Sequence, residues 1–393
     1  MTTTALAVSG INLFSKDSLE DPYPGYKELR NAAPVVWMRR HHFAAITRFQ
    51  DVRAALQNAA VFSSASGVAM NGIANRAQNG TMLASDNPRH NALRAIVSRP
   101  LTPAAVRELG AVIQRESESL VDRLVARRSF DAVGDLAWHL PLTVVSQLVG
   151  VPEDARAQMP SWASAAFDAS GPLNWRTVKS IPRMRSFVRY IMNPELPGRL
   201  RPDGWGARIF HAAACGEIDI AECPALLGDY LAPSLDTTAS ATASLVWLLS
   251  QNPAQWDAIR ADPSRIPNAV LEAIRLESPI PAFTRVVTED VDVGGVTVRR
   301  GTRVYLSYAS ANRDERKWWQ PERFDVSRRS IEQLGFGHGV HSCMGMHLAL
   351  LEIRSLLQSF ASRVRRFDAG QPRRQLNNCL RGFGHLPVTV EPA

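Results

Sequence analysis

A single cysteine stands where a glycine-rich stretch meets a helical pattern. Cys343 closes the stretch Phe336-Gly337-His338-Gly339-Val340-His341-Ser342, and apolar residues at helical spacing follow from Met344 to Phe360 without a proline. A thiol at a helix start faces backbone N–H groups and the positive end of the helix dipole, which stabilise a thiolate. Gly345 would let the helix approach a flat, bulky group, and Phe336 would pack against that group. The pattern therefore predicts that Cys343 is a metal-bound thiolate.

Two other interpretations use the same stretch. The glycines at 335, 337 and 339 could form a nucleotide-binding loop, although neither a preceding strand of a βαβ unit nor the second half of that fingerprint is present. His338, His341, Cys343 and His347 could instead hold zinc, because Cys343 and His347 lie four residues apart on one helix face. On these residues alone both alternatives stay open.

A second candidate site lies near residue 90. Asp86-Asn87-Pro88 has the character of a helix start, and His90 and Arg94 then fall four residues apart on one helix face. Two cationic donors placed in this way can clamp an anionic group. For this stretch by itself, a solvated helix face is the simpler interpretation.

A proline interrupts the long helical pattern that precedes residue 250. Pro233 cannot donate a hydrogen bond to the carbonyl of Asp229, so the hydrogen-bond ladder must open or kink there. Just past the opening, Asp236 and Thr237 place a carboxylate beside a hydroxyl, and Ser234 lies one turn before Thr237. The competing interpretation is a structural kink whose freed carbonyls are satisfied by polar side chains.

Taken together, these motifs resemble those of the cytochrome P450 superfamily. The pattern Phe-x-x-Gly-x-His-x-Cys-x-Gly, which ends at Gly345, resembles the cysteine-ligand loop of that superfamily. The resemblance implies heme b with its iron bound by Cys343, and a thiolate that favours O–O cleavage. It assigns oxygen activation to Asp236, Thr237 and Ser234. The heme-binding residues that it implies are His90, Arg94, Arg285, Phe336, His341, Cys343 and Gly345.

One departure from the superfamily pattern concerns oxygen activation. The superfamily usually has two small residues before x-Asp/Glu-Thr, whereas this chain has Pro233-Ser234 there. We expect a monooxygenase that uses O2 and external electrons, because Asp236 and Thr237 are retained. A peroxide-driven heme oxygenase and a heme-binding protein without turnover are the alternatives.

The resemblance also implies a fold. We expect a mainly α protein with the cytochrome P450 fold, in which residues 1–393 form one domain with a large helical part and a small β-rich lobe. Alternating Val/Thr runs and a Gly-Gly turn predict β-rich parts near 34–50, 283–307 and 376–391. Glu272, Arg275 and Arg323 are expected to form a buried, structural ion network.

The bulk composition limits the partners. The 393 residues carry a net charge of +8, but the basic residues are spread along the chain without zinc-finger or aromatic-interleaved spacing, which argues against nucleic acid. An acidic electron donor of the ferredoxin or flavodoxin type fits better. Four cysteines form no disulfide framework and indicate a reducing cytosol. The first ten residues lack a basic start and a long apolar core, so we expect a cytoplasmic protein without a signal peptide or membrane anchor.

The substrate follows from a finer resemblance, to the bacterial branch that demethylates or hydroxylates para-substituted benzoates. It implies a small aromatic substrate, which would contact Ser66, Phe167, Asp229, Ile280, Phe283 and Phe383. In that branch we expect an arginine where Ser66 stands and a small polar residue where Asp229 stands. A carboxylate at 229, about two turns before Thr237, would repel a benzoate unless it is protonated or paired, for instance with Arg76. We therefore expect a methoxyphenol oxidised at its methoxy carbon, with Asp229 accepting the phenol hydrogen bond. A para-substituted benzoate is the alternative.

Overall fold

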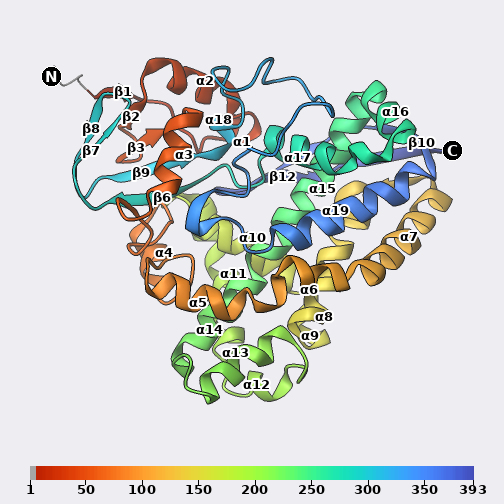
Figure 1. Ribbon diagram of the computed structural model, residues 1–393, viewed down its shortest axis with the longest axis horizontal. Helices are drawn as coiled ribbons and strands as arrows, with labels where there is room; N and C mark the ends of the chain where they lie inside the picture. Colours follow the sequence, from red (N-terminus) through yellow and green to blue (C-terminus); the bar gives the residue numbers. More distant parts are fainter. Residues whose placement is uncertain (1–5) are drawn as a thin grey trace.

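Two long helices run through the middle of the molecule, α15 (Pro233–Gln251) and α19 (Met346–Ala361) (Figure 1). The computed structural model describes residues 6–393. The apolar face of α19 packs against α7 (Gly110–Arg127) and α17 (Ile266–Glu277), and α15 packs against both α17 and α19. The buried side chains of these four helices belong to the largest apolar cluster of the protein. We call these four packed helices the helical frame. The cysteine loop leads directly into one of them, α19.

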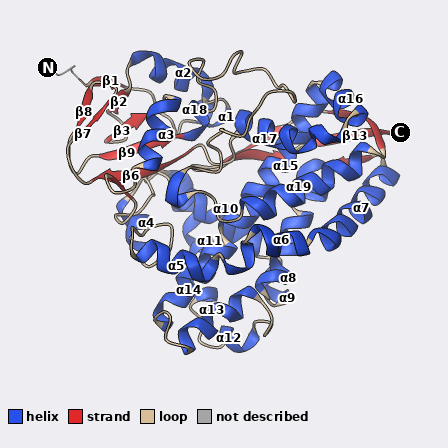
Figure 2. Ribbon diagram, in the orientation of Figure 1, coloured by secondary structure: helices blue, strands red, loops and turns tan. Residues whose placement is uncertain are grey.

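The other helices surround this frame (Figure 2). Their bounds are α1 (Lys16–Glu20), α2 (Tyr23–Ala32), α3 (Phe49–Gln57), α4 (Gly72–Ala77), α5 (Arg89–Val97), α6 (Pro103–Glu108), α8 (Ser146–Val149), α9 (Glu153–Arg156), α10 (Met159–Ala169), α11 (Trp175–Ile191), α12 (Leu196–Arg199), α13 (Trp205–Ala214), α14 (Cys223–Leu231), α16 (Pro253–Ala261) and α18 (Tyr308–Ala311). Within residues 6–393, no helix is long and apolar enough to cross a membrane. The expectation about the chain start rests partly on residues 1–5, which lie outside the described residues.

A six-stranded sheet forms the small β-rich lobe, in the order β1-β2-β3-β9-β6-β4. Its strands are β1 (Ala7–Ser9), β2 (Val35–Met38), β3 (Phe43–Ile46), β4 (Phe62–Ser63), β6 (Ala282–Val287) and β9 (Arg303–Ser307). In β6, Arg285 pairs with Val304 of β9. The predicted Gly-Gly turn joins β7 (Val291–Val293) and β8 (Val296–Val298), and both of its glycines have positive φ.

The C-terminal strands make two smaller sheets. Strands β10 (Val364–Ala369), β13 (Pro387–Pro392) and β5 (Ser129–Asp131) form one of them. Strands β11 (Arg373–Leu376) and β12 (Arg381–His385) form a hairpin, and residues 377–380 are its tip. This hairpin packs against α15, so its tip lies at the edge of the helical frame. Strands therefore occur in each of the three regions where the sequence predicts them.

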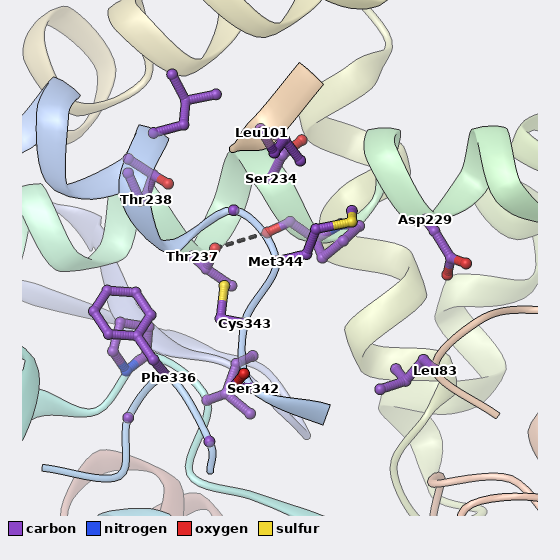
Figure 3. A pocket seen from close by; sticks show the side chains of 18 of the residues that line it. Leu83, Leu101, Asp229, Ser234, Thr237, Thr238, Phe336, Ser342, Cys343 and Met344 are labelled. Carbon is purple, nitrogen blue, oxygen red and sulfur yellow. Dashed lines mark hydrogen bonds between the residues drawn. The ribbon is translucent and has the colours of Figure 1, made fainter. Parts of the chain in front are cut away.

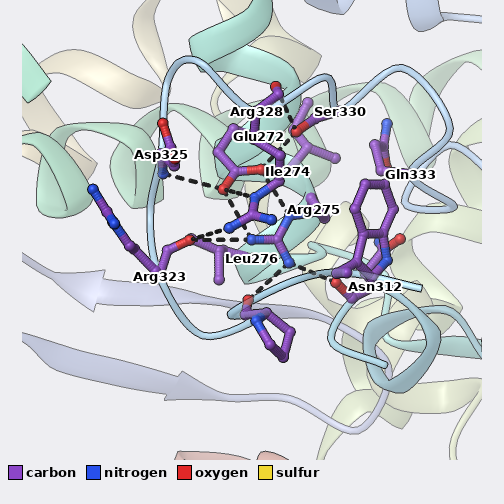
Figure 4. A network of polar contacts seen from close by, with 12 residues as sticks. Glu272, Ile274, Arg275, Leu276, Asn312, Arg323, Asp325, Arg328, Ser330 and Gln333 are labelled. Carbon is purple, nitrogen blue, oxygen red and sulfur yellow. Dashed lines mark hydrogen bonds and ion pairs between the residues drawn. The ribbon is translucent and has the colours of Figure 1, made fainter. Parts of the chain in front are cut away.

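A buried ion network ties α17 to the segment that leads into the cysteine loop (Figure 4). Two guanidinium nitrogens of Arg275, Nε and Nη2, donate to the Glu272 carboxylate at 2.7 and 2.9 Å. Both side chains are fully buried. The second cation is Arg328, whose Nε donates to Glu272 at 3.0 Å. The prediction of Arg323 is wrong in this respect, because Arg323 offers only its backbone carbonyl to Arg275 and its guanidinium turns to the Gln320 side chain. The side chains of Glu272, Arg275 and Arg328 are not among those that line the cavity described below.

Candidate active site

The cysteine loop is held by its own backbone. The Cys343 N–H donates to the carbonyl of Phe336 at 2.8 Å, and α19 begins three residues later at Met346. Gly339 has a φ of +70°, and a side chain there would collide with the carbonyl oxygen of Leu56 at the end of α3. A glycine is therefore required at 339, and the contact with α3 sets the height of the loop.

The Cys343 side chain is exposed to a large cavity in the interior, which it lines (Figure 3), and protein surrounds that cavity. Burial raises the pKa of its thiol above the usual value, while the Gly345 N–H, the Arg94 guanidinium and the Met346 N–H oppose that rise. Desolvation therefore outweighs the stabilisation that the helix start was expected to provide. A thiolate at this position needs the charge of a bound metal ion, which deprotonates a coordinating thiol outright.

Two imidazoles and two guanidiniums lie beside the cysteine loop. His90 and His341 face each other with ring centroids 4.2 Å apart, and the Nε2 atom of each is buried without a hydrogen-bond partner in residues 6–393. Burial lowers the pKa of both, that of His341 to about 3, so the rings are neutral. Arg94 donates to the Ser342 carbonyl at 2.9 Å and Arg285 to the Thr284 carbonyl at 2.8 Å. Two imidazole nitrogens without partners beside two guanidiniums favour the binding of an anion here.

The helix with the proline divides at Ala232 into α14 and α15. The φ and ψ of Ala232 stay helical at −75° and −49°, so the axis continues while the hydrogen bond that Pro233 cannot donate is missing. Ser234 and Thr237 line the cavity just beyond this gap, and the Thr237 hydroxyl donates to the Pro233 carbonyl at 2.7 Å. Asp236 does not line the cavity, because it is on the opposite, buried face of α15. The predicted trio is thus split between two faces.

Asp229 lines the same cavity from α14, on the far side of the gap. Its carboxylate accepts the backbone N–H of Met82 at 2.9 Å, and burial raises its pKa to about 7. The suggested partner Arg76 is exposed on α4 and makes no contact with it. A backbone amide therefore holds this carboxylate in place of an arginine, and the group stands near the midpoint of its titration at neutral pH.

Of the other predicted substrate contacts, Phe167, Ile280 and Phe283 line the cavity and two residues do not. Ser66 is exposed, because a turn closed by the Gly67 N–H and the Ser64 carbonyl carries it outwards. Phe383 is buried, with its ring 5.9 Å from that of Trp247. Its register in β12 points it into the helical core rather than towards the cavity.

Sequence reasoning missed one ionisable residue of the cavity, Glu352. Glu352 is fully buried on α19, its Oε1 has no hydrogen-bond partner in the described chain, and it borders the cavity. Burial raises its pKa to about 8. The available signal was a lone acid in the otherwise apolar pattern from Met344 to Phe360. Neutral Glu352 is therefore the dominant form at physiological pH.

The site favours a flat, doubly anionic cofactor with a metal centre over zinc and over a nucleotide, since no strand of the described chain leads into the glycine stretch as a nucleotide-binding loop requires. No group of three or more His, Cys, Asp or Glu side chains within residues 6–393 could hold a metal ion, which leaves the zinc interpretation without a ligand set. Heme fits the donors. Cys343 would bind the iron, the His90 and His341 Nε2 atoms would donate to the carboxylates when they carry the ring proton, and the Cβ position of Gly345 opens onto empty space.

Comparisons with known proteins agree with this geometry. A family model described as cytochrome P450 matches residues 211–389. Cytochrome P450 CYP199A2 of Rhodopseudomonas palustris is 35% identical over 98% of this chain and 94% of its own length. Erythromycin C-12 hydroxylase of Saccharopolyspora erythraea is 32% identical over 92% of each chain. The crystal structure of P450BioI in complex with an acyl carrier protein ligated to hexadec-9Z-enoic acid superposes with a TM-score of 0.86, at 26% identity, over 95% of this chain and 99% of that one.

Proposed function

The chain belongs to the cytochrome P450 family, whose members bind heme b through a cysteine thiolate, and we propose that it oxidises a small neutral aromatic substrate, a methoxyphenol, with Asp229 as the acceptor for the phenol hydroxyl. As a monooxygenase of this family it uses O2 and electrons from a redox partner. The observation that carries the substrate proposal is the Asp229 carboxylate, which is fixed in the wall of an otherwise largely apolar cavity.

The cofactor would be held from two sides. Cys343 would bind the iron, and His90, His341, Arg94 and Arg285 would bind the two propionates. Phe336 and Gly345 border its flat face. When bound, heme supplies the oxidising chemistry that inserts one atom of O2 into a substrate C–H bond. The residues of the chain bind the substrate, exclude water and hold protons.

Proton handling falls to the cavity face of α15. The Thr237 hydroxyl donates its hydrogen bond to the Pro233 carbonyl, so its oxygen lone pairs are free to accept a hydrogen bond from the cavity. The Ser234 hydroxyl donates to the Tyr230 carbonyl in the same way, one turn earlier. The two hydroxyls therefore present a row of acceptors to the cavity, and Asp236, on the buried face of the same helix, is the proton source in this proposal.

Substrate orientation follows from the position of Asp229. Leu83, Phe167, Ile280 and Phe283 supply apolar and aromatic walls, while Asp229 is the acid that α14 presents to the cavity. A phenol hydroxyl donates to this carboxylate and the ring fills the apolar space. Because the methoxy group of guaiacol is ortho to the hydroxyl, the hydrogen bond to Asp229 also fixes where the methoxy carbon lies in the cavity. Oxidation of the methyl carbon gives a hemiacetal that releases formaldehyde.

The test measures substrate binding to the holoenzyme through the low- to high-spin shift of its Soret band. We expect guaiacol or syringol to give the shift, with an affinity that rises with pH through about 7, because Asp229 must be ionised to accept the hydrogen bond. Methoxybenzene, which lacks the hydroxyl, is the matched control and should bind about tenfold or more weakly. In Asp229→Asn the dependence on pH should disappear.

Tight binding of 4-methoxybenzoate with no response to either phenol would contradict the proposal. That result would favour the second candidate, a para-substituted benzoate. Protonated Asp229 could bind the benzoate carboxylate by donating a hydrogen bond to it. The two candidates predict opposite trends, since benzoate affinity would fall as pH rises through about 7.

The electron donor and the location follow from charge and cysteine chemistry. A net charge of +8 favours an acidic partner of the ferredoxin or flavodoxin type, because complementary charge speeds association. The four cysteines are all free thiols, as expected for the reducing cytoplasm. We propose both an acidic electron donor and a cytoplasmic location.

A further inference from the structure

The outer face of α11 carries exposed apolar side chains. Six of the fourteen large apolar residues that are exposed within residues 6–393 lie in the segment 173–192, and the other eight are spread over the rest of the sequence. These six residues, which are 43–67% exposed, are Leu173, Trp175, Val178, Ile181, Val188 and Met192. From Trp175 to Met192 they follow one another at steps of three, four or seven residues, which place them on one face of the helix. We call these six residues the α11 stripe.

The opposite face of α11 is the one that packs on the protein. Thr177, Ser180 and Phe187 are buried there, and the helix contacts α10 and α14. The stripe is therefore turned away from the core and adds nothing to it. Exposed apolar residues that gather on one face among polar ones mark an interaction site.

The charged side chains of α11 are all cationic. The helix has no acidic residue, and its cations are Arg176, Lys179, Arg183, Arg185 and Arg189. Burial raises the pKa of Asp168 on α10, and Arg176 and Arg183 oppose that rise, so these two cations have a neighbouring acid. Lys179, Arg185 and Arg189 are exposed and take part in no ion pair within residues 6–393. Their charge is available to a partner.

Apolar side chains among unpaired cations fit an anionic lipid surface, and we propose that the α11 stripe binds bilayers rich in anionic headgroups. The apolar side chains enter the boundary between headgroups and acyl chains, while Lys179, Arg185 and Arg189 contact the lipid phosphates. The Lys179 ammonium lies 5.2 Å from the centroid of the Trp175 ring. An aromatic ring and a cation that project together suit this boundary, where one end is apolar and the other wet.

Two features define the kind of contact. It is peripheral, because no helix within residues 6–393 is long and apolar enough to cross a bilayer, so a cytoplasmic protein can make it. A symmetric dimer through the same stripe would bring like charges face to face, which opposes a second copy as the occupant. Neither the cavity nor Asp229 takes part, so membrane binding of this kind is independent of the substrate proposal.

Flotation of the holoenzyme with lipid vesicles, without substrate, tests the stripe. We expect binding to vesicles of phosphatidylglycerol and phosphatidylcholine in equal parts, and binding about tenfold weaker to phosphatidylcholine alone or in about 0.5 M salt. Trp175→Gln should weaken binding to the anionic vesicles by about fivefold. Trp319→Gln is the matched control and should leave binding unchanged, because Trp319 is as exposed as Trp175, 70% against 67%, and lies outside the stripe.

The cations are tested by two double variants with the same net charge. Arg185→Gln with Arg189→Gln should weaken vesicle binding by about tenfold, whereas Arg107→Gln with Arg115→Gln, at exposed positions of α6 and α7, should not. Equal binding within either matched pair would overturn the proposal, as would the absence of binding to anionic vesicles by the unaltered protein. A dimer in sedimentation velocity that Trp175→Gln abolishes would also overturn it, because a second copy would then cover the stripe.

Discussion

One hydroxyl on the cavity face of α15 is expected to decide how oxygen is used. Thr237 is held by the Pro233 carbonyl at 2.7 Å, with its lone pairs towards the cavity. We predict that Thr237→Ala binds heme and substrate normally but directs electrons into hydrogen peroxide, so that product per electron falls by about tenfold or more. Thr237→Ser keeps the hydroxyl and should stay coupled. The measurement is product and peroxide formed per electron supplied.

Full coupling in Thr237→Ala would move the role elsewhere on the same helix face. Ser234 is the next hydroxyl, one turn earlier and also in the cavity wall. A Ser234→Ala, Thr237→Ala double variant then separates Ser234 from bound water as the proton carrier. If the double variant also stays coupled, side-chain hydroxyls of α15 take no part in proton delivery.

At the scale of elements, the Glu272 network joins α17 to the segment below the cysteine loop. Glu272 accepts from Arg275, Arg328 and the Ser330 hydroxyl in a fully buried place. We predict that Glu272→Gln lowers the free energy of unfolding by about 3–5 kcal/mol, because two guanidiniums are left without their counter-charge. Urea denaturation and heme retention measure the effect. Asp290→Asn, in an exposed pair with Arg299, should change neither quantity, and an equal loss in both variants would contradict a special role for the network.

At the scale of the whole molecule, buried acids set the dependence of stability on pH. Asp229, Asp236 and Glu352 have pKa values raised to about 7, 8 and 8 from ordinary values near 4. Above about pH 4 the folded state therefore binds more protons than the unfolded state, and the stability from this source is lost as pH rises towards about 8. Glu277 acts in the opposite sense, because its pKa is lowered to about 2 and its contribution is lost only in acid.

This balance predicts that Tm of the holoenzyme falls between about pH 6 and about pH 8, and that Glu352→Gln makes the fall smaller. The neutral amide is isosteric and cannot lose a proton, so the variant should be the more stable protein at the alkaline end. Glu289→Gln, at an exposed position, should follow the wild type. If Glu352→Gln also follows the wild type, Glu352 has the same proton affinity in the folded and unfolded states.

Local patterns and side-chain directions differ in how far the sequence predicts them. The cysteine loop, the opening at Pro233 and the Gly294-Gly295 turn were predictable because each depends on neighbours in the chain. Arg328 in place of Arg323 was not, because the path of the loop decides which guanidinium enters. Likewise, the Met82 N–H that holds Asp229 has no signature in a pattern of side chains. Contacts that backbone groups make across the fold are therefore not predictable from the pattern of side chains.

The gap in the helix at Pro233 also bears on how this protein could acquire new substrates. Asp229 lies on one side of the missing hydrogen bond and Thr237 on the other, so the helix bends at the lowest cost between them. Replacements on α14 that shift its path are absorbed at this point before they reach the hydroxyl row. Recognition can thus diversify while the oxygen-handling half of the helix is left undisturbed, which makes α14 the segment on which selection, natural or in the laboratory, can act most freely.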